Sequence, residues 1–153
     1  MKENQMEKKQ DSPQTVPHLS INDIYLFNTG NAQKAYLTFG CHYIRETGEH
    51  RFCVWAPNAR SVSLVGDFNG WDPAKQVMQR TTGGVYYIFV KGLKNGDLYK
   101  YAITGYDGVQ RYKSDPFAFY AEVRPDTASK VWELDGYQWH DTAYMDKRAK
   151  KDP

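Results

Sequence analysis

Between residues 40 and 113 the sequence consists of short segments in which apolar and polar side chains alternate. A period of two is the pattern of a β-strand that has one buried face. The candidate strands are 40–46, 51–56, 60–65, 85–91, 98–104 and 109–113, of which 85–91 is apolar on both faces and is expected to be central. Turn-forming pairs lie between them: Thr47-Gly48, Pro57-Asn58, Gly83-Gly84, Asn95-Gly96 and Asp107-Gly108. Short strands joined by turns, with no helix between them, predict an all-β fold, an antiparallel sandwich of immunoglobulin-like size.

The chain before this region follows other patterns. Residues 1–18 are polar, balanced in charge and contain two prolines, so we expect a disordered leader. Residues 19–36 predict a short helical segment, because Ser20 and Asp23 form a variant of the capping box. Apolar residues then recur at helical spacing, and Gly30 is suited to end the helix.

The alternation fades after Lys113. We therefore expect the β-sandwich to occupy residues 37–120. Residues 121–153 are rich in aromatic and turn-forming residues but show no clear period, which predicts an irregular C-terminal linker that packs on another body.

The composition excludes several classes of function. With 20 basic and 18 acidic residues the net charge is +2, too balanced for a protein that binds nucleic acid through charge. No apolar run is long enough to cross a membrane or to serve as a signal peptide, so we expect a cytoplasmic protein without membrane contact. Cys41 and Cys53 should lie on opposite faces of a sheet, and the four histidines have no metal-ligand spacing. We thus expect neither a disulfide nor a metal site.

No catalytic motif stands out. Aspartates such as Asp67, Asp72 and Asp115 lie in or beside turns, where capping of the local backbone accounts for them. The sequence contains no Gly-x-Ser-x-Gly nucleophile motif and no glycine-rich phosphate loop. We therefore expect no catalytic residues, no cofactor and no enzyme activity from this chain alone.

Two aromatic residues and a lysine remain as candidates for a binding site. Trp71 lies in the loop Gly66-Asp-Phe-Asn-Gly-Trp-Asp-Pro, and adjacent strands could bring Lys100 and Tyr112 to the same sheet edge. Aromatic rings stack on the C–H faces of glucose, and a lysine donates hydrogen bonds to sugar hydroxyls. Alternatively, Trp71 fills a gap in the core and Tyr112 is an ordinary edge residue. The residues alone leave both interpretations open.

Several motifs together resemble a known family. The stretch FGCHYIRETGEHRFCVWAPNARSVSLVGDFNGWD, followed by YKYAI, YKSDPFAF and RPDTASKVW, is similar to the N-terminal region of bacterial glycogen (1,4-α-glucan) branching enzymes. That region is a module of carbohydrate-binding family 48, which precedes the catalytic barrel in glycoside hydrolase family 13. The resemblance covers roughly residues 20–150 and implies an immunoglobulin-like sandwich.

The resemblance also implies functional residues. The sugar site of glycogen-binding relatives matches Trp71, Lys100 and Tyr112 here, although those relatives have tryptophan at the position of Tyr112. The partners implied are α-glucans such as glycogen and malto-oligosaccharides, and a catalytic barrel domain that residues 121–153 would lead toward. The barrel carries the catalytic Asp and Glu of the branching reaction, and this chain does not contain it.

Two functions follow as expectations. The first is a glucan-binding and scaffolding module of a glycogen branching enzyme, which transfers α-1,4-glucan segments to form α-1,6 branches. The alternative is a protein-interaction module that packs on a catalytic or regulatory partner without binding sugar.

Overall fold

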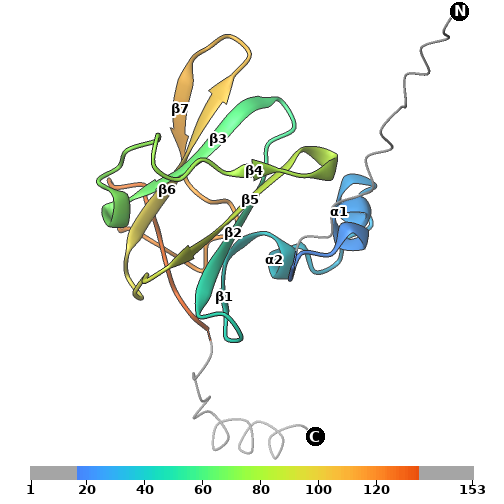
Figure 1. Ribbon diagram of the computed structural model, residues 1–153, viewed down its shortest axis with the longest axis horizontal. Coiled ribbons are helices and arrows are strands. Elements are labelled where there is room, and N and C mark those ends of the chain that lie inside the picture. The colour runs from blue at the N-terminus through green and yellow to red at the C-terminus, as the bar shows by residue number, and fades with distance from the viewer. Residues whose placement is uncertain (1–16, 135–153) are drawn as a thin grey trace, which may run out of the picture.

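The computed structural model describes residues 17–134. Two antiparallel sheets pack face to face, which confirms the all-β sandwich (Figure 1). The first sheet has the strand order β1-β2-β5-β4, and the second has the order β3-β6-β9-β8 with β7 also paired to β6. The strands are β1 (Gly40–Ile44), β2 (Glu49–Trp55), β3 (Ala59–Gly66), β4 (Gln79–Arg80), β5 (Val85–Lys91), β6 (Leu98–Gly105), β7 (Gln110–Lys113), β8 (Tyr120–Ala121) and β9 (Ser129–Lys130).

Two short helices precede the sandwich, as the sequence predicts for residues 19–36. Helix α1 (Ile21–Asn28) is capped by Ser20, whose hydroxyl accepts a hydrogen bond from the Asp23 backbone N–H at 3.2 Å. Gly30, which has a positive φ, lies just beyond the end of α1. Helix α2 (Ala35–Thr38) then leads into β1. Both helices lie beside the first sheet (Figure 1). None of the described helices is long and apolar enough to cross a membrane.

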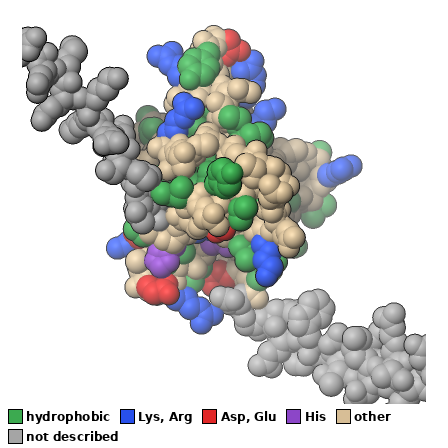
Figure 2. All heavy atoms as spheres, turned by 90° about the vertical axis from the view of Figure 1, so that its right-hand side faces the viewer, with side chains coloured by type: hydrophobic (Ala, Val, Ile, Leu, Met, Phe, Trp, Pro, Cys, Tyr) green, Lys and Arg blue, Asp and Glu red, His purple; other side chains and the backbone are tan. Residues whose placement is uncertain are grey.

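The first sheet is buried on both of its faces. One face packs against the second sheet around Phe52, Tyr99 and Tyr101, and the other packs against the helical segment around Phe39 and Cys53. This explains why most of β2 and much of β5 are apolar at successive positions instead of alternating. Figure 2 views the molecule from the helical side, where hydrophobic side chains are interspersed with polar groups.

The two cysteines follow this division. Cys41 belongs to the core between the sheets and Cys53 to the core beneath the helices. Both are buried and free, on opposite faces of the first sheet as the period-two pattern predicts.

The second sheet continues beyond residue 120. Strand β9 pairs with the start of β6, and Val131 is fully buried with its N–H bonded to the carbonyl of Asp97 at 2.8 Å. The expectation of irregular structure from residue 121 onward is therefore wrong for β9 and Val131. The expected leader and linker otherwise fall largely on residues 1–16 and 135–153, which lie outside the described residues.

Candidate functional site

The loop after β3 is fixed by its own side chains. Asn69 is 4% exposed; its amide donates to the carbonyl of Leu64 at 2.9 Å and its carbonyl accepts from the N–H of Gly66 at 3.0 Å. Gly66 is required here because a Cβ would lie 2.2 Å from the carbonyl oxygen of Leu98. Phe68, at the 3₁₀ turn η1 (Asp67–Asn69), packs against the core between the sheets. Phe68 therefore anchors the loop to the core, and Trp71 belongs to neither core cluster.

Trp71 has an unusual backbone conformation. Its φ is +60°, directly after Gly70 at +66°. A bulky residue in the left-handed region is rare and costs about 1–3 kcal/mol. The N–H of Trp71 donates to the carbonyl of Gly66 at 3.0 Å, and the indole Nε1 donates to Asp67 Oδ1 at 3.2 Å. These contacts hold the half-buried ring in one orientation.

Lys100 lies on the outer face of β6. Its backbone pairs with Val65 of β3, near the start of the Trp71 loop. Its Nζ donates to Thr127 Oγ1 at 2.8 Å, in the connection between β8 and β9. The amine is thereby positioned, and an ammonium group keeps two further donors for a ligand.

Tyr112 lies on β7 opposite Ala102, two residues beyond Lys100 along β6. Side chains at alternate positions of a strand share a face, so Lys100 and Tyr112 lie on the same side of the sheet. Tyr112 is 49% exposed, and its hydroxyl donates to Gln110 Oε1 at 3.3 Å.

A buried aspartate anchors the chain after β7. Asp115 Oδ2 accepts hydrogen bonds from the hydroxyls of Tyr99 at 2.7 Å and Tyr101 at 3.0 Å. Burial raises the pKa of the Asp115 carboxyl, and the hydrogen bonds oppose this effect. Its backbone N–H also donates to the hydroxyl of Ser129 on β9. Asp115 therefore ties β6, β7 and β9 together beneath the site.

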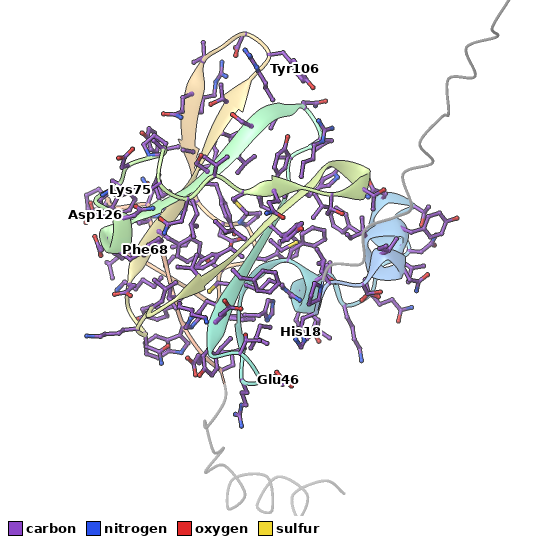
Figure 3. The ribbon with its side chains drawn as sticks, in the orientation of Figure 1. His18, Glu46, Phe68, Lys75, Tyr106 and Asp126 are labelled. Carbon is purple, nitrogen blue, oxygen red and sulfur yellow. The ribbon has the colours of Figure 1, made fainter. Side chains whose placement is uncertain are left out.

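The sequence-predicted residues Trp71, Lys100 and Tyr112 line one hollow, which we call the Trp71 hollow. Its volume is about 570 Å³, within the roughly 300–1,000 Å³ typical of ligand pockets. The other lining residues are Asp67, Leu98, Glu122, Pro125, Asp126, Thr127 and Ala128. In Figure 3, Phe68, Lys75 and Asp126 mark this side of the molecule, away from the helices.

Sequence reasoning missed the wall of the hollow formed by residues 122–128. Asp126, Thr127 and Glu122 come from the segment expected to be a linker. Asp126 and Thr127 belong to the family-like stretch RPDTASKVW, but neither that motif nor the Pro125-Asp126 pair indicates what this segment faces. Among the described residues, no cluster of His, Cys, Asp and Glu is arranged to hold a metal ion.

A family model matches residues 38–118, more than half of the chain; it describes carbohydrate-binding module 48, the isoamylase N-terminal domain. The chain belongs to the carbohydrate-binding module 48 family. The module is also similar to curated proteins. It is 48% identical to the 1,4-alpha-glucan branching enzyme GlgB of Geobacillus stearothermophilus, in a match that covers 84% of this chain and 21% of GlgB. It is 45% identical to the GlgB protein of Thermosynechococcus vestitus, in a match that covers 90% of this chain and 18% of that protein.

The module thus spans about a fifth of these branching enzymes. Among solved structures, it is similar to a pullulanase from Bacillus acidopullulyticus. The TM-score is 0.52 at 28% identity, over 63% of the module and 12% of the pullulanase chain. These similarities agree with the resemblance stated from the motifs.

Proposed function

We propose that the module binds neutral α-glucan in the Trp71 hollow. The observation that supports this proposal is the convergence of an oriented indole, a second exposed ring and a positioned amine on one hollow. Trp71 comes from the loop after β3, Lys100 from β6 and Tyr112 from β7. The apolar ring faces would stack on glucose rings, and the Lys100 amine would donate to hydroxyls.

The charge of the lining agrees with a neutral ligand. Asp67, Glu122 and Asp126 are carboxylates, and Lys100 is the one basic residue of the hollow as described. An anionic ligand would meet like charges, whereas sugar hydroxyls can donate to carboxylate oxygens.

The expected affinity is weak. Covering about 40 Å² of apolar surface per ring contributes about 1 kcal/mol at ~25 cal/mol/Å². Two rings and one or two hydrogen bonds of about 1 kcal/mol each must offset the cost of immobilising a flexible glucan. We expect a dissociation constant of roughly 0.1–10 mM for a short malto-oligosaccharide.

The relatives suggest a role for this binding. They are named 1,4-alpha-glucan branching enzymes, and the module matches only part of each. We propose that the module serves such an enzyme by holding α-glucan and by packing on its catalytic barrel. Branching itself would be carried out by the barrel.

Affinity electrophoresis in gels that contain glycogen tests the proposal. We expect glycogen to slow the migration of the 153-residue chain. The Trp71→Ala variant should migrate at the same rate with and without glycogen. Trp132→Ala is the matched control, because Trp132 is also partly exposed but stacks on Tyr120 outside the hollow. Circular dichroism would verify that each variant is folded. If a folded Trp71→Ala variant remains fully retarded, the glucan site lies elsewhere; if the unchanged chain is never retarded, the interaction-module alternative is favoured.

A further inference from the structure

The turn between β5 and β6 holds the chain that follows β9. In this turn the N–H of Gly96 donates to the carbonyl of Val131 at 2.8 Å, and the N–H of Val131 donates to the carbonyl of Asp97 at 2.8 Å. Further along, the N–H of Glu133 donates to Oδ1 of Asn95 at 3.1 Å. We call these three hydrogen bonds the exit clamp, because they hold the last described residues against the turn.

The exit clamp contains one of the two Asn-Gly pairs of the sequence, Asn95-Gly96; the other is Asn69-Gly70. An Asn-Gly pair can modify itself without an enzyme. The backbone nitrogen of the glycine attacks the carbon of the asparagine side-chain amide and forms a new N–C bond, and the amide nitrogen leaves as ammonia with the proton of the attacking N–H. Water then opens the resulting succinimide ring to aspartate or isoaspartate. Glycine favours the attack because it has no Cβ to hinder it.

The Asn95-Gly96 pair is open to this reaction on its outer side. Both residues are exposed, and a Cβ built on Gly96 would meet no atom within 4 Å. Asn69, in contrast, is 4% exposed, and its amide and carbonyl are both bonded to backbone groups of its own loop. Asn69 can therefore turn toward Gly70 only if that loop opens.

The exit clamp occupies both reacting groups of Asn95-Gly96. The attacking nitrogen carries the N–H that is bonded to Val131, and the amide that must be attacked is bonded through its oxygen to Glu133. The nitrogen has to lose its proton and the side chain has to rotate toward it, so both hydrogen bonds must break first. The reaction rate therefore follows the fraction of molecules in which Val131 and Glu133 have left the turn.

We propose that Asn95-Gly96 is a self-modification site gated by the exit clamp, and that its conversion to isoaspartate loosens the clamp. In isoaspartate the main chain runs through the former side chain and is longer by one carbon atom, which moves Gly96 out of register with Val131. The new carboxylate also lies in the same turn as Asp97, whose own carboxylate already accepts from the N–H of Lys94 at 2.8 Å. The modified module would thus hold Val131 less firmly. This inference does not depend on glucan binding.

Ageing of the 153-residue chain tests the proposal. The folded protein is incubated in mildly alkaline buffer, and the peptides that contain each Asn-Gly pair are analysed by mass spectrometry at intervals. The same chain unfolded in urea gives the reference rates, which should be similar for the two pairs. In the folded protein we expect Asn95 to convert more slowly than in urea but much faster than Asn69.

Removal of one guarding N–H tests the gate. Proline has no backbone N–H, so Glu133→Pro removes the donor to Asn95, and the pair should convert about two- to ten-fold faster, the effect of one hydrogen bond. Leu134→Pro is the matched control, because the N–H of Leu134 bonds to no other described residue, and it should leave the rate unchanged. Circular dichroism verifies that each variant is folded. If Glu133→Pro unfolds, Val131→Ala takes its place, since it shortens a fully buried side chain of the clamp and should also speed the conversion.

Hydrogen exchange tests the consequence. The modified chain carries an extra negative charge and can be separated from the unmodified chain by ion exchange. The N–H of Val131 should exchange faster in the modified chain. The N–H of Met78, which donates to the carbonyl of Val62 at 2.9 Å, is the control and should exchange equally in both.

Three results would each overturn the proposal. If Asn95 converts no faster than Asn69 in the folded chain, the pair is not a modification site. If it converts as fast as in urea, or if loss of the guarding contact leaves its rate unchanged, the clamp is not the gate. If Val131 exchanges equally in both chains, the modification does not loosen the clamp. None of these results bears on glucan binding.

Discussion

The left-handed backbone at Trp71 makes a prediction that is independent of any ligand. Trp71 has a φ of +60°, which glycine adopts freely and alanine does not. Replacing Trp71 by alanine or by glycine removes the same ring contacts and the same Asp67 hydrogen bond. The difference in stability between the two variants therefore reports the backbone conformation.

The expected difference follows from two opposing effects. A side chain with a Cβ costs about 1–2 kcal/mol in the left-handed conformation. Alanine also restricts the unfolded chain, which favours it over glycine by about 0.4–1 kcal/mol. The first effect is larger, so Trp71→Gly should be more stable than Trp71→Ala by about 0.5–1 kcal/mol. This corresponds to an increase in melting temperature of about 2–5 °C for a domain of this size.

Urea unfolding followed by circular dichroism measures the difference. Lys75 is the matched control position, because it is exposed, lies in the same loop region and does not have a positive φ. There the order should reverse, with Lys75→Ala more stable than Lys75→Gly. If Trp71→Ala is as stable as Trp71→Gly, the strained conformation does not exist in solution and the argument for an imposed ring orientation fails.

Three further predictions concern other parts of the structure. Asn69→Ala should lower the free energy of unfolding by about 2–3 kcal/mol, because it leaves the N–H of Gly66 and the carbonyl of Leu64 unpaired. As the control, a change of the exposed Asn58 to alanine should alter the free energy of unfolding by less than about 0.5 kcal/mol. A smaller loss at Asn69 in urea unfolding would contradict this account of the loop. Tyr112→Trp should tighten maltoheptaose binding a few-fold in calorimetry because the larger ring covers more sugar surface; unchanged affinity would place Tyr112 outside the contact. Burial lowers the pKa of His50 below 6.5, against the opposing effect of Glu133. Below pH 6.5 the unfolded chain therefore binds a proton more readily than the folded chain. The free energy of unfolding should decrease as the pH drops through 6.5, and it should decrease less steeply in the His50→Gln variant. An equal slope for both proteins would exclude His50 as the cause.

The strands that alternate in sequence were predictable, and so was the helix start at Ser20. Strand β9 was not, because a pair such as Ser129–Lys130 is too short to show a period and its partners lie on the distant β6. Trp132 stacks on Tyr120 of β8 at a centroid distance of 5.2 Å, and both rings are still more than 40% exposed. The expectation that this segment packs on another body therefore stays a prediction. Such pairings depend on tertiary contacts that one sequence does not reveal.

The candidate site divides in a similar way. The residues alone grouped Trp71 with Lys100 and Tyr112 at one sheet edge, and the family resemblance implied that the three form a sugar site. The partner of Lys100, Thr127, could not be found, because it comes from a connection with no regular pattern. The positive φ of Trp71 was equally hidden, since the sequence Asn-Gly-Trp predicts a left-handed glycine but not a left-handed tryptophan after it.

The placement of the two cysteines has a practical consequence for labelling. Burial raises the pKa of Cys53 to about 12 and that of Cys41 further, so neither thiol ionises readily in the folded protein. Alkylating reagents attack thiolates, and buried thiols of this kind are inert. The chain contains no other cysteine. A single cysteine introduced on the exposed surface would therefore accept a fluorophore selectively. The reaction rate of Cys41 would report how often the two sheets separate, and that of Cys53 how often the helical segment leaves the first sheet.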